Sequence, residues 1–553
     1  MTRTAIFRDL VPARLRRQWA TDGTYQNLTL YQRFLAHVAP HPAQEAVIDD
    51  DGTTSYWELA GAAEGCAAGL LANGVTAGDV VAINLANGWR ACAVDLACAA
   101  IGAIALPYPV GRGRDETLAM LRRSGAVCLI AERVWNDARY DHLIADLKDD
   151  LPELRRTFFH NPGRGNDLDR LMATARAADL LAGVTPPHPD APARILVSSG
   201  SEAEPKMVLY SHNALADGRG RFINALHSGT RPMRSLYLVP LASSFGSTAT
   251  ACTLAKMGGT VLVRPKFEAA AALRIIDEHR PTHVLGVPTT FQKMMVMPEM
   301  HRTDTSSLIA VVCGGARIDA DTVEEVRRTF GCAFVNLYGS ADGVNSHTAL
   351  DDPPDIVKST VGRPDPLVNT IRILDPNGED CPVGTEGEVW SRGPMSPLCY
   401  VNAPELDETY RNADGWVHTG DRGSFGEDGR LRISGRGKEI IIRGGQNISP
   451  TEIELQLRGA PGVLHAVCVG VADKLFGERV CACIVPADLA HPPSLKELCT
   501  FLTTQRGLET FKLPEFLLVL AELPMSPAGK VDKNALRRFA AESRALESRE
   551  RTV

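Results

Sequence analysis

The sequence predicts an α/β protein with at least two domains, and three observations carry that prediction. The chain has 553 residues, more than one hydrophobic core usually supports. Short apolar runs alternate with helical stretches over the first 360 residues or so, which is typical of parallel sheets with helices on both faces. After about residue 360, Gly and Pro become dense between short apolar runs, which indicates a β-rich subdomain.

The alternation is clearest between residues 80 and 107. Val80–Asn84 is a short apolar run, Asp95–Ile101 is helical in pattern, and Ala103–Leu106 is typical of a strand that ends before a proline. The same rhythm recurs at residues 261–263, 283–285 and 309–312. Residues 91–107 form the most apolar stretch, but a membrane span needs about 20 apolar residues and this stretch contains Asp95. We therefore expect a buried helix that leads into a core strand.

A second domain is expected after a segment of glycine and basic residues, Gly435–Lys438. The chain then continues as a compact α/β unit of an ordinary size for a small domain. We place the boundary at Lys438, which gives an N-terminal domain over residues 1–437 and a C-terminal domain over residues 438–553. The β-rich part covers about residues 360–437. The charged stretch from about Ala540 onward is expected to be frayed.

The composition is that of a soluble globular protein, with 44% hydrophobic and 23% charged residues. The net charge of −7 argues against nucleic acid or an anionic membrane as the main partner. The 13 cysteines lack paired metal-ligand spacing, and Cys481 and Cys483 lie in an apolar run that indicates a buried strand. An odd cysteine count without a secretion signal fits a reducing cytosol, so we expect a cytoplasmic protein.

The most informative segment is a phosphate loop with an unusual sequence. Residues 195–212 read ILVSSGSEAEPKMVLYSH, an apolar strand, a Ser/Gly loop ending in Pro-Lys, and a second apolar strand. Such loops bind phosphates through backbone N–H groups, and small residues let the backbone approach the oxygens. Here Glu202 and Glu204 lie where a polyphosphate would bind. The loop residues of interest are Ser198, Ser199, Gly200, Ser201, Glu202, Ala203, Glu204 and Lys206.

Six motifs in order make the chain similar to the adenylate-forming superfamily of acyl-CoA ligases, peptide-synthetase adenylation domains and luciferases. The resemblance covers nearly the whole chain. The motifs are the loop at 198–208, Tyr338-Gly339, His418–Asp421, Gly435–Lys438, Gly444–Glu454 and Pro527–Lys530. The resemblance implies a large N-terminal domain of two parallel α/β sheet subdomains and a β-rich subdomain, with a small mobile α+β C-terminal domain.

The resemblance also implies a reaction in two halves. A carboxylate first attacks the α-phosphate of ATP to give acyl-AMP and pyrophosphate; the C-terminal domain then rotates about a hinge at Lys438, and a thiol such as that of CoA displaces AMP. Asp421 and Arg436 would hold the ribose, since a carboxylate accepts two hydrogen bonds from a diol. Further nucleotide contacts would come from Gly315, Ala316, Asn336, Tyr338, Gly339 and Ser340.

The remaining implied roles concern the two chemical steps. Lys530 would bridge the substrate carboxylate and the α-phosphate, a large electrostatic effect. Gly444 and Gly445 would line the thiol channel, because missing side chains leave room for a pantetheine arm. The acyl pocket would include Ala242, Ser243 and Gly314, small residues that suggest a roomy and even polycyclic site.

Each role has a simpler alternative that the sequence leaves open. Asp421 alone could be a turn cap, and Arg436 a surface ion pair. Lys438 could be an ordinary charged linker residue, the two adjacent glycines a plain turn, and Lys530 an exposed lysine. The family context favours the functional interpretation in each case.

Three departures from the family pattern concern adenylation. The phosphate loop has Glu202 in place of a threonine, Ala203 in place of a glycine and Met207 in place of the last glycine. One carboxylate about 4 Å from a phosphate charge costs roughly 4 kcal/mol at an effective dielectric constant of 20.

In the Tyr-Gly-x-Thr-Glu pattern, Ala341 replaces the threonine and Asp342 shortens the metal-associated glutamate, which makes Asp342 a poor Mg²⁺ ligand. Near Ala242 and Ser243, many relatives carry an aromatic residue and a histidine.

These departures affect the half-reaction that releases pyrophosphate, whereas the residues implied in thioester formation are intact. The hypothesis is therefore an acyl-CoA ligase that uses ready-made acyl-AMP, with CoA as co-substrate and a separate adenylating enzyme as a possible partner. ATP and Mg²⁺ are expected only if adenylation is retained. The departures resemble those of non-adenylating acyl-CoA ligases of the kind found in platensimycin biosynthesis.

Three alternatives stay open at the level of the sequence. One is a complete ATP-dependent ligase in which Glu202 and Glu204 point into solvent. Another is a catalytically inactive protein that binds an adenylate, and the last is a domain that loads a separate carrier protein. Retention of Lys530 favours adenylation, while an intact hinge argues against a mere binding protein. The chain is expected to be a monomer or homodimer that binds neither nucleic acid nor membrane.

Overall fold

The computed structural model describes residues 7–161, 167–174, 177–198, 205–227, 231–315, 318, 320–436, 441–457, 459–524, 531 and 533–550. Contacts between residues divide the chain into two compact units. The first unit holds most of the chain up to residue 437, and the second holds residues 438 onward together with the short segment 112–117. Among the described residues, none of the helices combines the length and apolar character that a membrane span requires.

An eight-stranded sheet forms one half of the first unit. Its strand order is β16-β15-β14-β13-β11-β12-β1-β2, in which β2 and β16 pair antiparallel at the edges and the six strands between them are parallel. The strands are β1 (Glu45–Asp49), β2 (Gly52–Ser55), β11 (Arg234–Tyr237), β12 (Thr260–Val263), β13 (His283–Gly286), β14 (Ala310–Gly314), β15 (Ala333–Ser340) and β16 (Val344–His347).

A seven-stranded sheet forms the other half, in the order β19-β10-β9-β4-β3-β5-β8. Strands β9, β4, β3, β5 and β8 run parallel, and β10 and β19 pair antiparallel at one edge. The strands are β3 (Val80–Asn84), β4 (Ile104–Pro107), β5 (Cys128–Glu132), β8 (Arg156–His160), β9 (Pro192–Ser198), β10 (Lys206–Ser211) and β19 (Cys399–Tyr400). The strands expected near residues 80, 104, 261, 283 and 310 are all confirmed.

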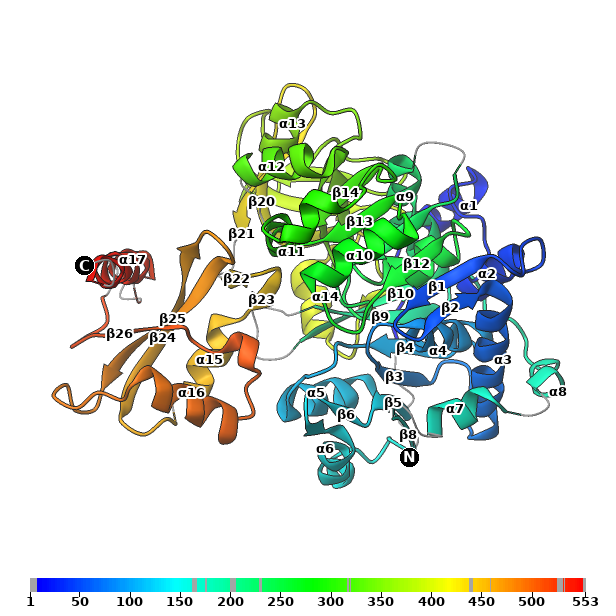
Figure 1. Ribbon diagram of the computed structural model, residues 1–553, viewed down its shortest axis with the longest axis horizontal. Helices are drawn as coiled ribbons and strands as arrows, with labels where there is room; N and C mark the ends of the chain where they lie inside the picture. The colour runs from blue at the N-terminus through cyan, green and yellow to red at the C-terminus, as the bar shows by residue number, and fades with distance from the viewer. Residues whose placement is uncertain are drawn as a thin grey trace. The chain divides into compact units, whose positions relative to one another are not determined.

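Alternating side chains of each strand enter different hydrophobic cores, as the two-residue period of a strand requires. Val81 and Val261, from the two sheets, both lie in a central core, while their neighbours Val80 and Leu262 lie in two separate outer cores. The central core therefore lies between the two sheets, and helices fill it. Figure 1 shows these helices beside the strands. They include α2 (Leu30–Val38), α3 (Tyr56–Ala72), α4 (Trp89–Ile101), α7 (Asp167–Met172) and α9 (Arg221–Leu226).

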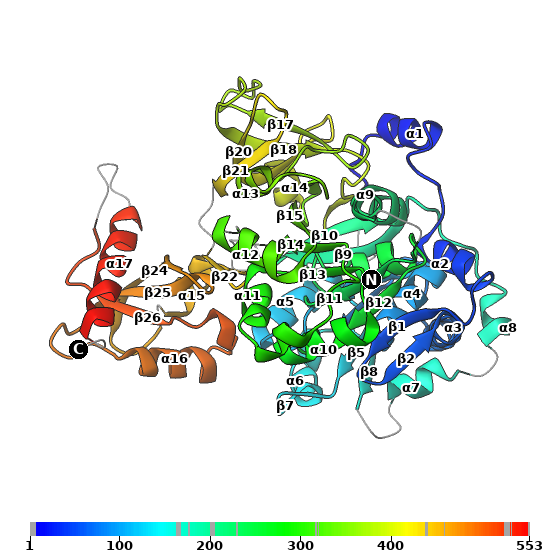
Figure 2. The same ribbon diagram turned by 45° about the horizontal axis from the view of Figure 1, so that its top comes forward.

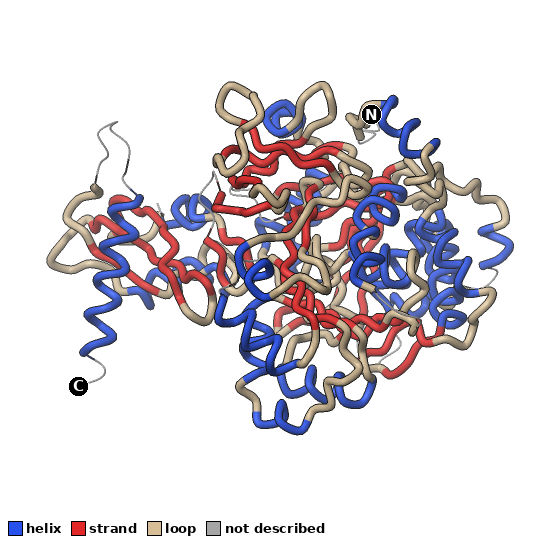
Figure 3. Tube along the Cα trace, turned by 90° about the horizontal axis from the view of Figure 1, so that it is seen from above, coloured by secondary structure: helices blue, strands red, loops and turns tan. Residues whose placement is uncertain are grey.

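Further helices cover the outer faces of the two large sheets, and Figure 3 shows helices on several sides of their strands. One outer core contains α10 (Ala269–His279), α11 (Pro288–Met295), α12 (Ala320–Phe330) and α13 (Pro354–Ser359). The other contains α1 (Ala13–Thr21) and α6 (Tyr140–Asp146). Residues 91–107 form the expected buried helix, α4, followed by the core strand β4.

The predicted β-rich region is a four-stranded antiparallel sheet in the order β17-β18-β20-β21. Its strands are β17 (Thr370–Leu374), β18 (Gly387–Arg392), β20 (Val417–Phe425) and β21 (Leu431–Arg436), and α14 (Pro404–Tyr410) lies between β18 and β20 in the sequence. Ile371, Ile373, Val389 and Leu431 form its core together with Val344 of β16. Strand β16 therefore links this sheet to the eight-stranded one.

The second unit is a five-stranded sheet with helices on both faces. Its strands are β22 (Ile441–Arg443), β23 (Gln446–Ile448), β24 (Val463–Asp473), β25 (Gly477–Pro486) and β26 (Phe516–Val519). On β25, Ala482 faces the core with α15 (Pro450–Leu457) and α16 (Leu495–Thr504), while Cys481 and Cys483 face the core with α17 (Lys533–Glu550). Figure 2 shows α17 and α16 across this sheet. Both cysteines are buried, as the apolar run predicted.

One expectation about this unit is wrong. The charged stretch from about Ala540 was expected to be frayed, but α17 continues to Glu550. Leu536 and Ala540, one helical turn apart, are buried against the sheet. This apolar stripe holds the helix although half of its other side chains are charged.

Candidate active site in the first unit

Two of the sequence motifs meet at the carboxyl end of β15. The Tyr338 hydroxyl of β15 donates a hydrogen bond to Asp421 Oδ2 of β20 at 2.7 Å. The alternation of β20 turns Thr419 and Asp421 toward the buried side, and Asp421 is only 4% exposed. The Asp421 backbone N–H donates to Thr419 Oγ1 at 3.2 Å, and that hydroxyl donates to the Val389 carbonyl. The carboxylate is therefore held in one orientation by three elements.

The geometry of Asp421 is compatible with the predicted ribose-binding role. A buried carboxylate accepts hydrogen bonds only, and a fixed carboxylate can accept both hydroxyls of a vicinal diol. In the open α/β sheets of many proteins, ligands bind just beyond the carboxyl ends of the parallel strands, where β15 presents Tyr338. The described contacts therefore fit the ribose-binding role predicted for Asp421.

The three residues after Gly339 are each fixed by a neighbour. The Ser340 hydroxyl donates to Asp342 Oδ2 at 3.1 Å, and the Tyr400 hydroxyl donates to Asp342 Oδ1 at 2.7 Å. Burial, and then the Asp342 charge, raise the pKa of Tyr400 well above its ordinary value, so this hydroxyl keeps its proton. The Tyr210 hydroxyl donates to the Ala341 carbonyl at 2.7 Å. Both oxygens of Asp342 thus already accept hydrogen bonds, and Ala341 offers no hydroxyl.

The last residue of the phosphate loop, Lys206, begins β10 and lies among aromatic rings. Its Nζ is 3.6 Å from the centre of the Tyr410 ring and 5.6 Å from that of Tyr400, and the residue is 8% exposed. His418 stacks on Tyr410 from β20, and burial lowers the pKa of His418, which favours a neutral ring. Such cation–π contacts stabilise a buried ammonium group by about 1–2 kcal/mol.

The residues predicted for the acyl pocket lie on a compact turn and at a strand end. Ala242 is buried in the turn 240–246, where the Ser243 hydroxyl donates to the Pro240 carbonyl at 2.7 Å and accepts from the Gly246 N–H. A Cβ at Gly246 would lie 2.0 Å from the Pro240 oxygen, so the turn requires glycine. Gly314 ends β14, and Gly315 follows with φ of +80°.

Other predicted nucleotide residues occupy places that also have structural reasons. The Asn336 amide donates to the carbonyls of Val357 and Thr360 at 3.2 and 3.0 Å, so its donors are used within the fold. Gly339 pairs with Asn345 of β16. Gly444 and Gly445 form the two-residue turn between β22 and β23 with φ of +56° and +80°, a conformation that glycine favours. Their predicted place in a thiol channel stays a prediction.

Several predicted site residues lie outside the described residues: Ser199, Gly200, Ser201, Glu202, Ala203, Glu204, Ala316, Lys438 and Lys530. For Ser198 and Arg436 only the backbone is described. The backbone of Arg436 pairs with that of Asp421 across β21 and β20. The two residues are therefore neighbours in space, as the predicted ribose role of Arg436 requires.

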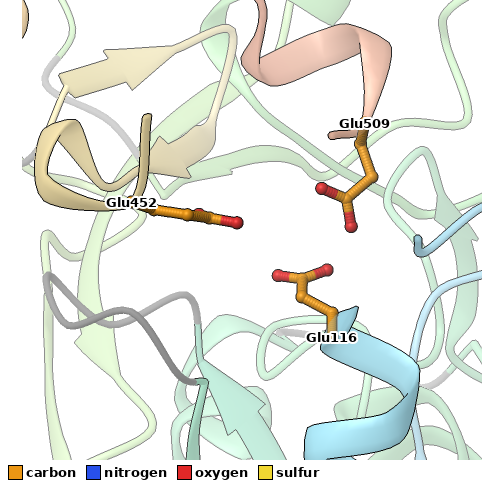
Figure 4. A group of neighbouring side chains, drawn as sticks. All are labelled: Glu116, Glu452 and Glu509. Atoms are coloured by element: carbon orange, nitrogen blue, oxygen red, sulfur yellow. The ribbon is translucent and has the colours of Figure 1, made fainter. Parts of the chain in front are cut away.

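One cluster of carboxylates suits a cation, but a lysine already contacts all three of its members. Glu116, Glu452 and Glu509, all in the second unit, point toward one another in Figure 4. Glu116 lies in the first turn of α5 (Arg114–Ser124), within the segment 112–117. The Lys512 ammonium lies 2.7, 2.8 and 3.0 Å from Glu116, Glu452 and Glu509 and is 1% exposed. The cluster is thus a buried ionic network.

The match to known protein families decides which family the chain belongs to. Residues 34–401 match the AMP-binding enzyme family, and residues 452–530 match the C-terminal domain of AMP-binding enzymes. The chain belongs to the AMP-binding enzyme family. This confirms the adenylate-forming superfamily and its fold, as the six motifs predicted. The candidate site therefore lies in a ligase of this superfamily. It contains Tyr338, Asp421, Asp342 and Lys206.

Relatives of this AMP-binding enzyme span almost its whole length. It is 30% identical over 512 residues, 90% of its chain and 91% of the relative, to the 2-hydroxy-7-methoxy-5-methyl-1-naphthoate–CoA ligase of Streptomyces carzinostaticus. It is 30% identical over 492 residues, 88% of its chain and 85% of the relative, to the salicyl-AMP ligase / salicyl-S-ArCP synthetase of Mycobacterium tuberculosis. The amide bond synthetase McbA from Marinactinospora thermotolerans has a similar structure, with a TM-score of 0.81, 29% identity and coverage of 93% and 99% of the two chains.

Sequence reasoning missed several residues that shape this site. Tyr210, Arg219 and Tyr400 lie outside the motif positions singled out above, yet each donates a hydrogen bond to residues 340–342. The partners are separated by 58 to 131 residues along the chain. A single sequence gives no indication that positions so far apart lie together. The only local signal is the apolar sequence around Tyr210 in β10 and around Tyr400 in β19.

Proposed function

We propose that this AMP-binding enzyme is an acyl-CoA ligase that acts mainly in thioester formation, converting acyl-AMP and CoA into acyl-CoA and AMP. In that step the CoA sulfur forms a bond with the acyl carbonyl carbon, the bond from that carbon to the AMP phosphate oxygen breaks, and the thiol proton passes to solvent. Adenylation from ATP is impaired or absent. A separate adenylating enzyme would then supply the acyl-AMP.

The proposal rests mainly on the side chains of residues 340–342 and the hydrogen bonds that they make. In the adenylate-forming pattern this segment supplies a hydroxyl and a metal-associated carboxylate to the triphosphate. Here Ala341 has no hydroxyl, and both oxygens of Asp342 accept hydrogen bonds from Ser340 and Tyr400. Each oxygen keeps a second lone pair, but the two donors fix the orientation of the shortened carboxylate, and Mg²⁺ tolerates poor ligand geometry badly. The described residues around Asp342 thus fit the metal poorly.

The sequence of the phosphate loop supports the same proposal. Glu202 and Glu204 add two negative charges to the loop that receives the departing diphosphate. The adenylate carries a single phosphate charge, so repulsion by these carboxylates weakens ATP binding far more than acyl-AMP binding. The ribose side is unaffected, since Tyr338 and Asp421 remain joined.

The second candidate is a complete ATP-dependent ligase. Two observations favour it: the chain keeps Lys206 and Lys530 of the adenylation motifs, and one relative with 30% identity is named a salicyl-AMP ligase. Lys530 is not needed for thioester formation. In the first candidate its charge neutralises the adenylate phosphate.

A two-arm turnover experiment separates the candidates. The purified protein receives either a free acid with ATP, Mg²⁺ and CoA, or the matching synthetic acyl-AMP with CoA. The acids are octanoate, benzoate, salicylate and 2-hydroxy-1-naphthoate, and product is measured by mass spectrometry. We expect acyl-CoA from at least one adenylate and at least 100-fold less from the corresponding acid.

The outcomes of this experiment are unambiguous. Equal rates in both arms, together with ATP–pyrophosphate exchange, would establish the ATP-dependent ligase. Consumption of no adenylate in the panel would contradict the thioesterification proposal. Replacing CoA with a primary amine in the second arm tests whether the acceptor resembles that of the amide bond synthetase; product from the amine and none from CoA would also contradict it.

A further inference from the structure

A buried arginine next to the site has no ionic partner among the described residues. Arg219 is 7% exposed and ends the π-helical turn η2 (Ala214–Arg219). Its Nη1 donates to the Ser340 carbonyl at 3.2 Å, and its Nη2 donates to the Ser244 carbonyl and hydroxyl at 3.0 and 3.1 Å. The guanidinium therefore joins β15 of the nucleotide site to the turn 240–246 of the predicted acyl pocket.

No carboxylate neutralises the charge of Arg219 within the described part of the chain, although its guanidinium lies 5.6 Å from the centre of the Tyr210 ring. No Asp or Glu oxygen there lies within 4 Å of its nitrogens, in contrast to the nearby buried Arg33, which pairs with Asp217 at 2.5 Å. The Nε of Arg219 is buried and has no hydrogen-bond partner. Burying an unpaired charge is costly, and buried cations are usually neutralised by an anion. The neutral carbonyl oxygens accept hydrogen bonds from this guanidinium but do not neutralise its charge.

A second polar side chain with unused capacity lies on the neighbouring strand. Asn345 of β16 is 7% exposed, and its side-chain amide makes no hydrogen bond within the described part of the chain. It pairs with Gly339, and a Cβ on that glycine would lie 3.7 Å from Asn345 Nδ2. The amide therefore faces Gly339, which has no side chain.

Helix packing brings Arg219 toward Asn345. Phe222 of α9 contacts the His347 ring with a centroid distance of 6.0 Å. Arg219 ends η2 three residues before Phe222, and its Nη1 reaches the Ser340 carbonyl. Asn345 lies two residues before His347 on the same strand face and pairs with Gly339, the residue before Ser340. Two buried donors from different elements thus converge beside the acyl side of the site.

We propose that Arg219, assisted by Asn345, recognises an oxygen on the acyl group itself, so that this enzyme selects acids bearing a second carboxylate, phenolate or hydroxyl group. The inference rests on the proposed function, because it takes the acyl-adenylate as the ligand. It goes beyond that function in naming the substrate class and the residues that select it. An anionic oxygen at this position supplies the charge that Arg219 lacks, and the Asn345 amide donates to the same group.

Binding of stable adenylate analogues tests this selection without any turnover. The probes are 5′-O-(N-acylsulfamoyl)adenosines of benzoate and of its 2-, 3- and 4-hydroxy and carboxy derivatives, measured by calorimetry against the full-length protein. We expect at least one oxygenated analogue to bind at least tenfold more tightly than the benzoyl analogue. In Arg219→Met this preference falls to less than twofold, while the affinity for AMP stays within threefold of wild type.

Matched variants keep the test decisive. Arg219→Lys retains the charge and should keep part of the preference, and Asn345→Ala should lower it about threefold without affecting the fold. Equal weakening of all analogues in Arg219→Met would show that the residue only braces two loops, and this would overturn the inference. A wild-type protein that binds every analogue without preference would overturn it too. Failure to bind any analogue or AMP would instead contradict the proposed function.

Discussion

Replacing Tyr338 with phenylalanine removes the hydroxyl that orients Asp421 and leaves the ring in place. The lost hydrogen bond is 2.7 Å long and ends on a carboxylate that is 4% exposed. Hydrogen bonds to charged groups contribute about 1.5–3 kcal/mol, and the buried Asp421 loses a donor that water replaces poorly. If Asp421 binds the ribose, part of this free energy appears in ligand binding. We expect AMP to bind about 5- to 30-fold more weakly, or about 1–2 kcal/mol.

Calorimetric titration with AMP at fixed pH and ionic strength measures this effect. Tyr31→Phe is the matched control, because the Tyr31 hydroxyl also donates to a carboxylate, that of Glu64, at 3.1 Å but in the helices of the central core. It should lower the melting temperature without changing the affinity for AMP. A folded Tyr338→Phe variant that binds AMP within twofold of wild type would refute the reasoning that joins Tyr338 and Asp421 in a nucleotide site.

Three further predictions concern adenylation, pH and stability. The triple variant Glu202→Thr, Ala203→Gly, Ala341→Thr should bind MgATP at least 100-fold more tightly than wild type and show ATP–pyrophosphate exchange; unchanged ATP affinity would contradict the repulsion argument. Burial, and then the hydrogen bond with Glu116, raise the pKa of Glu509 to about 7. Since this pKa is above that of the unfolded chain, its contribution to stability is complete below about pH 4.5 and is lost as the pH rises from there to about 7, by about 1.4 kcal/mol per pH unit, with no further loss above the folded-state pKa. The melting temperature should therefore fall between pH 5 and 7 in the wild type and fall less in Glu509→Gln; an identical fall would exclude this group as the cause. Arg194→Met leaves Asp95 buried without its ionic partner and should cost about 3–5 kcal/mol of unfolding free energy in denaturant titration, whereas a loss below 1 kcal/mol would show that the pair is dispensable.

Local patterns were sufficient to predict much of the fold. The strands β3, β4, β12, β13 and β14 are short apolar runs bounded by turns or helices, and such runs form buried parallel strands whatever their partners are. The sequence could not show that alternate residues of β3 and β12 meet in one core between two sheets. That arrangement depends on contacts between residues about 180 positions apart.

The C-terminal stretch from about Ala540 was predicted wrongly. Charge density around Ala540 indicated a frayed end, but the helix α17 needs only a narrow apolar stripe to bind the sheet. Leu536 and Ala540 supply that stripe at helical spacing. Helical periodicity was therefore a better guide there than net polarity.

The candidate site was predictable where motifs carry it and unpredictable where tertiary contacts do. Motif order identified Tyr338 and Asp421, and the structure joins them directly. One of the two hydrogen bonds that the Asp342 carboxylate accepts comes from Tyr400, which lies 58 residues later on a two-residue strand. The uncompensated charge of Arg219 is equally invisible in sequence, because it depends on which carboxylates are absent around it.

The affinity ratio of AMP and MgATP tests the central claim most directly, because it does not depend on the identity of the acyl group. Calorimetric titrations of the wild-type protein with each nucleotide, in the same buffer, give both constants. The account predicts that MgATP binds at least 100-fold more weakly than AMP, corresponding to about 3 kcal/mol. MgATP binding as tight as AMP would contradict it.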